Sequence, residues 1–276
     1  MRFAKAHGLA NDFILVPSED VPDAAGEWAR NVCARHTGVG ADGVVLYELG
    51  EGRVAMRLYN ADGSDGNLSG NGLRCLAAYT VFKGWLPAQH VVETPPGPRA
   101  VEVERTGAVT FRVAADMGAP ILQSDKIPVC LEPPAPQVLD HVLDVDGARI
   151  RIIATSMGNP HCTLLLDEPA TLDTVERLGA AIEQHPFFPN RTNVEFAVAL
   201  SRSELAVQFW ERGVGLTQAS GTGSAAASVA AILAGRVDRR LRVVCAGGVL
   251  DVEWPEGGTL RQTGDVELLF EGQRLG

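Results

Sequence analysis

The residues best suited to chemistry stand in two short turns that share one pattern. Ser69-Gly70-Asn71-Gly72 and Ser220-Gly221-Thr222-Gly223 are separated by 151 positions, and each precedes an apolar, helix-compatible stretch, 73–83 and 224–234. The first backbone N–H groups of a helix have no partner within the helix, and the helix dipole favours negative charge there. The pattern therefore predicts two anion sites, which would bind one carboxylate if they converge.

A plainer interpretation is that Ser69 and Ser220 only cap helices beside flexible glycines, since serine is a preferred N-cap residue. One turn alone favours that interpretation. Two copies of the turn at matching positions of a repeat favour a binding role. A serine can cap a helix and bind a ligand at the same time.

Two further groups carry charge or a proton near such turns. His161 closes the tight polar turn Ser156-Met-Gly-Asn-Pro-His161 ahead of a strand, where a loop residue can face a cleft. Glu211-Arg212 is an ion-capable pair just before a Gly-rich loop, with a solvated salt bridge as the alternative. The remaining histidines show no metal-ligand spacing, so no metal site is predicted.

Two nucleotide-binding patterns are excluded. Gly38-Val-Gly-Ala-Asp-Gly43 matches G-x-G-x-x-G, but a strand-like segment, 44–47, follows it where a dinucleotide site needs a helix. Neither Gly-rich turn contains the Gly-Lys-Ser/Thr of a phosphate-binding loop.

The elements that must position these residues also repeat, at an offset of 150 or 151 residues. Gly8 and the strand-like 13–16 match Gly158 and the apolar run that follows it, and each helix-compatible stretch stops at a glycine, Gly84 or Gly235. A helix that is apolar nearly all round must be buried. The sequence therefore predicts two similar α/β domains, each with strands around a central helix, and a ligand site between them; the Pro-rich stretch 128–136 is interpreted as the linker.

Composition bounds the class of protein. The 276 residues are 46% hydrophobic and 21% charged, with a mean hydropathy of +0.05, as in globular proteins. The net charge of −10 argues against a nucleic-acid partner, and no apolar run is long enough for a membrane span. Five scattered cysteines and the lack of a secretory leader favour a cytoplasmic protein.

Motifs of a known family run through the chain in order: Lys5-Ala-His-Gly-Leu-Ala-Asn-Asp-Phe13, Arg35-His-Thr-Gly-Val-Gly-Ala-Asp-Gly43, Asn60-Ala-Asp-Gly-Ser64, Gly70-Asn-Gly-Leu-Arg-Cys75, Met157-Gly-Asn-Pro-His161, Arg191-Thr-Asn-Val194, Glu211-Arg-Gly-Val-Gly215 and Thr263-Gly264. Together they resemble the diaminopimelate epimerase family from end to end. The resemblance implies two pseudo-symmetric α/β domains of α+β type, each a barrel-like sheet around a central helix, with the active site in the interdomain cleft. We expect residues 1–120 with 265–276 in the first domain and residues 121–264 in the second.

The resemblance also implies function. It predicts an isomerase that interconverts L,L- and meso-diaminopimelate in lysine and peptidoglycan precursor biosynthesis, without PLP, another cofactor or a metal, and as a homodimer. It assigns the distal amino acid group of the substrate to Asn11, Asn60, Asn159, Asn193, Glu211 and Arg212. It assigns the reacting carboxylate to the backbone of Gly70, Asn71, Gly221 and Thr222, which agrees with the two predicted anion sites.

The departure from the family lies at the expected proton carriers, because Ser69 and Ser220 stand where the family has cysteines. His161 and Glu211, which in the family help to set the protonation of the thiols, are present. Three explanations are open. The chain is a natural serine variant that acts on an amino acid, a family member that uses the two predicted anion sites for another reaction or only for binding, or the product of a Cys→Ser exchange made in the laboratory. Ser224-Ala225, which replaces the Ala-Cys usual in the family, favours natural divergence.

Overall fold

The computed structural model describes residues 1–66 and 68–275, which form two compact units. Unit 1 comprises Met1–Asp116 and Thr263–Gly276, and unit 2 comprises Met117–Gln262. The chain therefore passes between the units twice. Among the described residues, no helix has the length and apolar character that a membrane crossing requires.

Unit 1 is a closed barrel around one helix. Eight strands pair in the order β1, β2, β3, β4, β6, β7, β8 and β17, and β17 pairs back with β1. The elements are β1 (Arg2–Gly8), β2 (Asn11–Pro17), a 3-10 turn (Ser18–Asp20), α1 (Ala25–Cys33), β3 (Gly43–Gly50), β4 (Arg53–Asn60), β5 (Asp65–Gly66), α2 (Gly70–Phe82), β6 (Gln89–Glu93), β7 (Arg99–Arg105), β8 (Thr110–Asp116) and β17 (Arg261–Gln273).

Unit 2 repeats this design. Its strands pair in the order β9, β10, β11, β12, β13, β15 and β16. The elements are β9 (Val138–Val145), β10 (Ala148–Ser156), β11 (Pro160–Leu166), α3 (Leu172–Glu183), β12 (Asn193–Ser201), β13 (Glu204–Glu211), β14 (Gly215–Thr217), α4 (Gly221–Leu233), β15 (Arg240–Cys245) and β16 (Gly248–Glu253).

The predicted duplication is confirmed element by element. In unit 1 the chain runs from β1 to β7 in the same order of strands and helices as from β10 to β16 in unit 2. The parallel pairs correspond as well, since β2–β3 matches β11–β12 and β4–β6 matches β13–β15. The α+β fold with a barrel-like sheet around a central helix is therefore confirmed.

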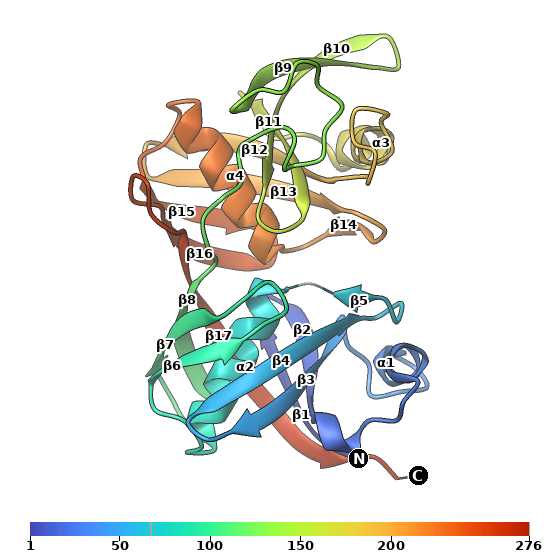
Figure 1. The fold of residues 1–276 in the computed structure, drawn as a ribbon, viewed down its shortest axis with the longest axis vertical. Coiled ribbons are helices and arrows are strands. Elements are labelled where there is room, and N and C mark those ends of the chain that lie inside the picture. The colour runs from blue at the N-terminus through green and yellow to red at the C-terminus, as the bar shows by residue number, and fades with distance from the viewer. Residues whose placement is uncertain (67, 276) are drawn as a thin grey trace. The chain divides into compact units, whose positions relative to one another are not determined.

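Each central helix is buried on all sides, as its apolar composition predicts. All residues of α2 from Gly70 to Thr80 are buried, and so are all of α4 from Gly221 to Ile232. Figure 1 shows each helix running through its own unit among the strands. Gly84 and Gly235, which follow the helices, have φ values of +70° and +67°, the left-handed conformation expected of a residue that ends a helix.

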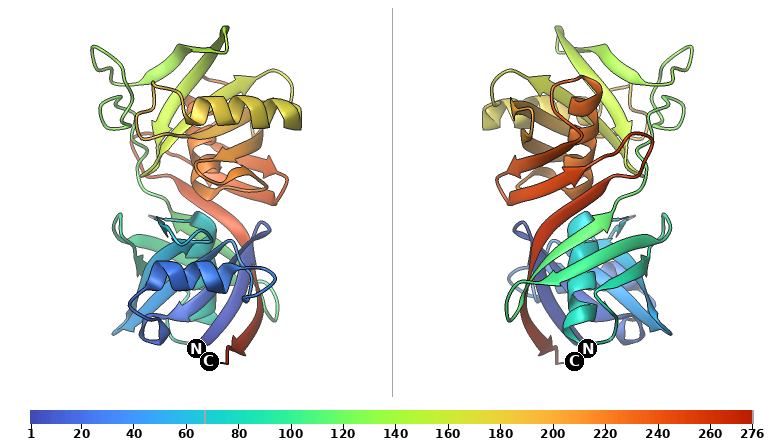
Figure 2. Two further views of the ribbon diagram at one scale, coloured as in Figure 1. Left: turned by 90° about the vertical axis from the view of Figure 1, so that its right-hand side faces the viewer. Right: turned by 90° about the vertical axis from the view of Figure 1, so that its left-hand side faces the viewer.

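The other two helices cover strands from outside, as Figure 2 shows for α1 and α3. Val32 on α1 and Val44 on β3 belong to one hydrophobic core cluster, and Ile182 on α3 and Phe196 on β12 belong to another. Both helices are amphipathic, because only one side of each meets the strands.

The prediction that residues 128–136 form the linker was wrong. This stretch lies inside unit 2, where Val129 and Leu131 pack against the hydrophobic core. The Cys130 N–H donates to the Phe187 carbonyl at 2.9 Å, and the Ala135 N–H donates to Ser124 Oγ at 2.8 Å. Prolines interrupt the helix and strand patterns here, but the half-buried side chains of Val129 and Leu131 still pack against the core.

Candidate active site

The two serine turns have the same local geometry. Ser69 and Ser220 are both N-caps in extended backbone, with φ/ψ of −117°/124° and −138°/124°. Ser69 Oγ accepts a hydrogen bond from the Gly72 N–H at 3.1 Å, and Ser220 Oγ accepts one from the Gly223 N–H at 3.2 Å. Both serines therefore cap their helices, as the plainer interpretation proposes. Capping still leaves the amides of the first two helical residues for a ligand.

The third helical position leaves little room for a side chain. A Cβ on Gly223 would lie 3.0 Å from both Ser220 Oγ and Phe209 Cδ1, and one on Gly72 would lie 3.2 Å from Val45 Cγ2. These approaches are shorter than ordinary carbon contacts. The second glycine of each turn thus lets the helix start lie directly against its cap and the neighbouring strand.

In unit 1 the side chain of Asn71 is directed into the protein. It is fully buried, donates from Nδ2 to Asn11 Oδ1 at 3.1 Å and accepts a hydrogen bond from Arg74. Asn11 in turn donates to Asp42 Oδ2 at 2.8 Å. Asn11 and Asn71 are therefore brought together, while Asn60 lies at the end of β4, where it donates to Ser64 Oγ at 2.9 Å.

A charged network that the sequence analysis missed holds the starts of β2 and β3. Asp12 forms ion pairs with Lys5 at 2.7 Å and with Arg35 at 2.9 Å, and Arg35 also pairs with Asp42 at 2.7 Å. Burial alone would raise the pKa of Asp12, but the hydrogen bonds from Arg35 and Lys5 outweigh burial and hold it far below its usual value. The opposite charges within the Lys5–Phe13 and Arg35–Gly43 motifs were the available signal.

In unit 2 His161 lies at the second position of β11 and is fully buried, rather than in a loop that faces a cleft. Its Nδ1 lies 2.6 Å from Glu195 Oε1, and its Nε2 lies 3.0 Å from Asn159 Oδ1. Glu195 was also missed, because it lies in an apolar strand and lacks a neighbouring charge in the sequence. Both ring nitrogens of His161 thus have partners other than Ser220.

Asn193 joins two segments of the predicted distal-group site. It donates from Nδ2 to the Pro160 carbonyl at 3.0 Å and accepts from the Arg212 N–H at 2.9 Å. The exposed Arg212 side chain donates to the Asn190 carbonyl at 3.0 Å. The turn after β13 is therefore fixed to the starts of β11 and β12.

The same turn is also held by Glu183, which accepts hydrogen bonds from Trp210 Nε1 at 2.7 Å, from Arg191 Nη1 at 2.9 Å and from the Gly213 N–H at 3.0 Å. Burial would raise the pKa of this carboxyl, but these three donors lower it overall. Glu183 thus acts as an anionic anchor for the loop that carries Arg212.

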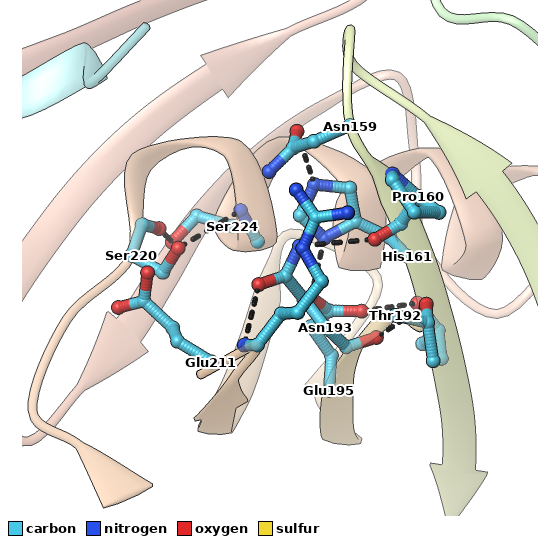
Figure 3. Close-up of polar contacts among 12 residues, drawn as sticks. Asn159, Pro160, His161, Thr192, Asn193, Glu195, Glu211, Ser220 and Ser224 are labelled. Carbon is cyan, nitrogen blue, oxygen red and sulfur yellow. Dashed lines mark hydrogen bonds and ion pairs between the residues drawn. The ribbon is translucent and has the colours of Figure 1, made fainter. Parts of the chain in front are cut away.

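Glu211 is the carboxylate that approaches a serine turn. Figure 3 shows its side chain directed toward Ser220, and its Oε1 accepts from Thr217 Oγ1 at 2.7 Å. The backbone of Ser220 also accepts a hydrogen bond, from Ser224 Oγ at 2.6 Å. Unit 2 therefore brings Asn159 together with His161, Asn193 together with the Arg212 backbone, and Glu211 toward Ser220. Its other predicted site residues, Gly221 and Thr222, are the first two residues of α4.

Comparison with known proteins gives matches over the whole chain. The family model described as diaminopimelate epimerase matches residues 3–122 and 153–269. A diaminopimelate epimerase of Desulfitobacterium hafniense is 42% identical, over 100% of this chain and 98% of the relative. One of Pelotomaculum thermopropionicum is 43% identical, over 99% of this chain and 98% of the relative.

Solved structures resemble this fold at lower sequence identity. A predicted epimerase from Pseudomonas aeruginosa has a TM-score of 0.71 and 16% identity, covering 100% of this chain and 99% of that one. A probable proline racemase from Agrobacterium radiobacter has a TM-score of 0.70 and 15% identity, covering 99% and 92%. At these identities the likeness concerns the fold.

Proposed function

Because this chain belongs to the diaminopimelate epimerase family, we propose that it inverts an amino acid Cα and that the helix N-termini of α2 and α4 stabilise the reacting carboxylate. The chain is an isomerase of the diaminopimelate epimerase type, an activity of lysine biosynthesis. The proposed reaction interconverts L,L- and meso-diaminopimelate. The observation that carries the proposal is the pair of capped helix starts with matching geometry, in a chain that matches the family over its full length.

The reacting carboxylate is assigned to the amides of Gly70, Asn71, Gly221 and Thr222. Removal of the Cα proton places negative charge on the carboxylate oxygens, so N–H groups already directed at those oxygens stabilise the transition state more than the ground state. The amides are part of rigid, buried helices and need little reorganisation during the reaction. This assignment requires the two predicted anion sites to bind the same carboxylate.

The distal amino acid group is assigned to Asn11, Asn60, Asn159, Asn193, Glu211 and Arg212. A guanidinium can bind a carboxylate through two parallel hydrogen bonds, and a carboxylate can accept from an ammonium group. Arg212 and Glu211 thus suit the two charges of a distal amino acid group.

Ser69 and Ser220 are assigned as the two groups that carry protons to and from Cα. An aliphatic hydroxyl is a much weaker acid than a thiol, so a serine must be assisted by a base in order to remove a proton. Glu211, directed toward Ser220, is the assigned assistant on that side. His161 is held by Glu195 and Asn159, which argues against a direct role in the same step.

The alternative is a family member that binds an amino acid without epimerising it, or that acts on a different amino acid. The serine oxygens favour this alternative, because each already accepts a capping hydrogen bond and a hydroxyl is weakly acidic. The predicted cytoplasmic location, homodimer, and independence of PLP and metals belong to the same proposal. The homodimer and the independence of PLP rest on the family resemblance.

Incubation of the protein with L,L-diaminopimelate in deuterium oxide tests the proposal. Epimerisation should incorporate deuterium at Cα, as read by mass spectrometry, and the Ser69→Ala/Ser220→Ala double variant should abolish it. Calorimetric titration of the same amino acid separates the alternatives. Binding without deuterium incorporation would favour the binding function, and the lack of both would refute diaminopimelate as the ligand.

A further inference from the structure

The buried contacts of His161 connect a carboxyl group in the core to one of the assigned substrate-binding residues. Glu195 on β12 and His161 on β11 have side chains that are 1% and 0% exposed, whereas Asn159 is half-buried. In the parallel pairing of β11 with β12, His161 is opposite Asn193 and Thr163 is opposite Glu195. Side chains two residues apart on a strand share one face, so this register places Thr163, Glu195 and His161 together.

The partners of the imidazole determine where its protons are. Asn159 is oriented with Oδ1 toward the ring, and an amide oxygen only accepts, so this orientation assigns a hydrogen to His161 Nε2, which donates it. Thr163 Oγ1 donates to Glu195 Oε2 at 3.3 Å, which leaves Oε1 to face His161 Nδ1 at 2.6 Å. One proton must lie between Oε1 and Nδ1, because two lone pairs would otherwise repel at this distance.

That shared proton makes the pair neutral overall. Whether it resides on the carboxyl or on the ring, Glu195 and His161 together carry no net charge, as a fully buried pair requires. Burial raises the pKa of Glu195, which agrees with a proton held at this position. His161 keeps its Nε2–H in either case.

We propose that Glu195 is a positioning residue, which acts through His161 to fix the carboxamide of Asn159. The Nε2–H of His161 binds Asn159 Oδ1 and so leaves the NH₂ group of Asn159 to donate to the distal carboxylate of the substrate. The inference rests on the proposed function in that it takes Asn159 as a substrate contact. It gives His161 an orienting role, distinct from proton exchange with a serine.

We call the contacts from Glu195 through His161 to Asn159 the relay. Four variants test it by calorimetric titration with diaminopimelate. Glu195→Leu leaves Nδ1 without its partner and frees the ring to reorient, so the Kd should rise about tenfold. Glu195→Gln is the matched control, because its NH₂ group can donate to Nδ1 while its oxygen accepts from Thr163. Its Kd should stay within about threefold of the parent.

The decisive comparison uses Asn159→Ala. If Glu195 acts through Asn159, then Glu195→Leu should weaken binding no further in the Asn159→Ala background. The same tenfold loss in both backgrounds would overturn the relay and indicate a general structural effect. If Glu195→Leu does not fold, as judged by thermal unfolding, a tenfold loss in Glu195→Gln would overturn it instead.

Nitrogen NMR of the ligand-free protein labelled in histidine gives a second readout. His161 Nε2 should be protonated in the parent and in Glu195→Gln, and Glu195→Leu should lose the downfield proton shared at Nδ1. An unprotonated Nε2 in the parent would overturn the relay whether or not diaminopimelate binds. A parent that shows the expected ring signals but binds no diaminopimelate would refute the proposed function and leave the Glu195–His161 orientation established.

Discussion

Replacing both capping serines by cysteine, Ser69→Cys with Ser220→Cys, should raise epimerisation of diaminopimelate by several orders of magnitude. A free thiol has a pKa near 8.5, and an aliphatic hydroxyl lies roughly 5 units higher. At about 1.36 kcal/mol per unit, forming the base from serine costs about 7 kcal/mol more, or roughly 10⁵-fold in rate if fully expressed.

The structure indicates that the site would accept the thiolates. Each side chain lies at a helix N-terminus, where the Gly72 and Gly223 N–H groups, 3.1 and 3.2 Å from the present oxygens, would donate to a negatively charged sulfur. Thiols in such positions have lowered pKa values. The rest of the turn is unchanged by the substitution.

The assay is deuterium exchange at Cα of L,L-diaminopimelate, with product stereochemistry determined separately. Each single variant should gain far less than the pair, since inversion needs a base on one face and an acid on the other. Ser228→Cys, a buried serine later in α4, is the matched control for adding a thiol. A folded double variant that is no faster than the parent, or a parent already as fast, would refute this reasoning.

Other perturbations test the remaining parts of the site. Arg212→Ala should weaken diaminopimelate binding by about 2 kcal/mol in calorimetry, because the guanidinium is assigned to the distal carboxylate, whereas the exposed Arg202→Ala should not; equal affinities would refute the assignment. Asp12→Asn should reduce the acid sensitivity of folding: the pKa of Asp12 is lowered in the folded state, so the stability it contributes is fully present above the ordinary carboxyl pKa of about 4 and is lost progressively as the pH falls from there toward the lower folded-state pKa. Urea unfolding at pH 7 and at about pH 3 measures this, and equal acid losses in parent and variant would contradict it. Ser69→Ala should lower the free energy of unfolding by about 1 kcal/mol through loss of the N-cap, and an unchanged urea midpoint would show that the cap contributes nothing.

Local chemistry made the helix starts predictable from the sequence. Serine, two glycines and an apolar run specify a cap, a close approach and a buried helix within a few residues, and the repeat showed that two such units exist. The glycines at 84 and 235 likewise marked the helix ends, because left-handed backbone favours glycine at the residue after a helix.

Contacts between distant segments were not predictable in the same way. The partner of His161 is Glu195, 34 positions later, and only the register between β11 and β12 brings them together. The linker prediction for 128–136 was wrong because the prolines show only the local backbone. The packing of Val129 and Leu131 depends on a core assembled from the rest of unit 2. Residue types predict local backbone well, but side-chain partners follow from strand pairing.

The return of the chain into unit 1 determines the order in which the two units can be completed during synthesis. Every residue of unit 2 has been added by position 262, whereas the barrel of unit 1 still lacks β17, the strand between β1 and β8. Although the ribosome makes most of unit 1 first, unit 2 is the first to have its full set of strands. Until the last strand leaves the ribosome, β1 and β8 are open edges that can pair with other chains, so a chain that stalls near residue 260 should aggregate through unit 1.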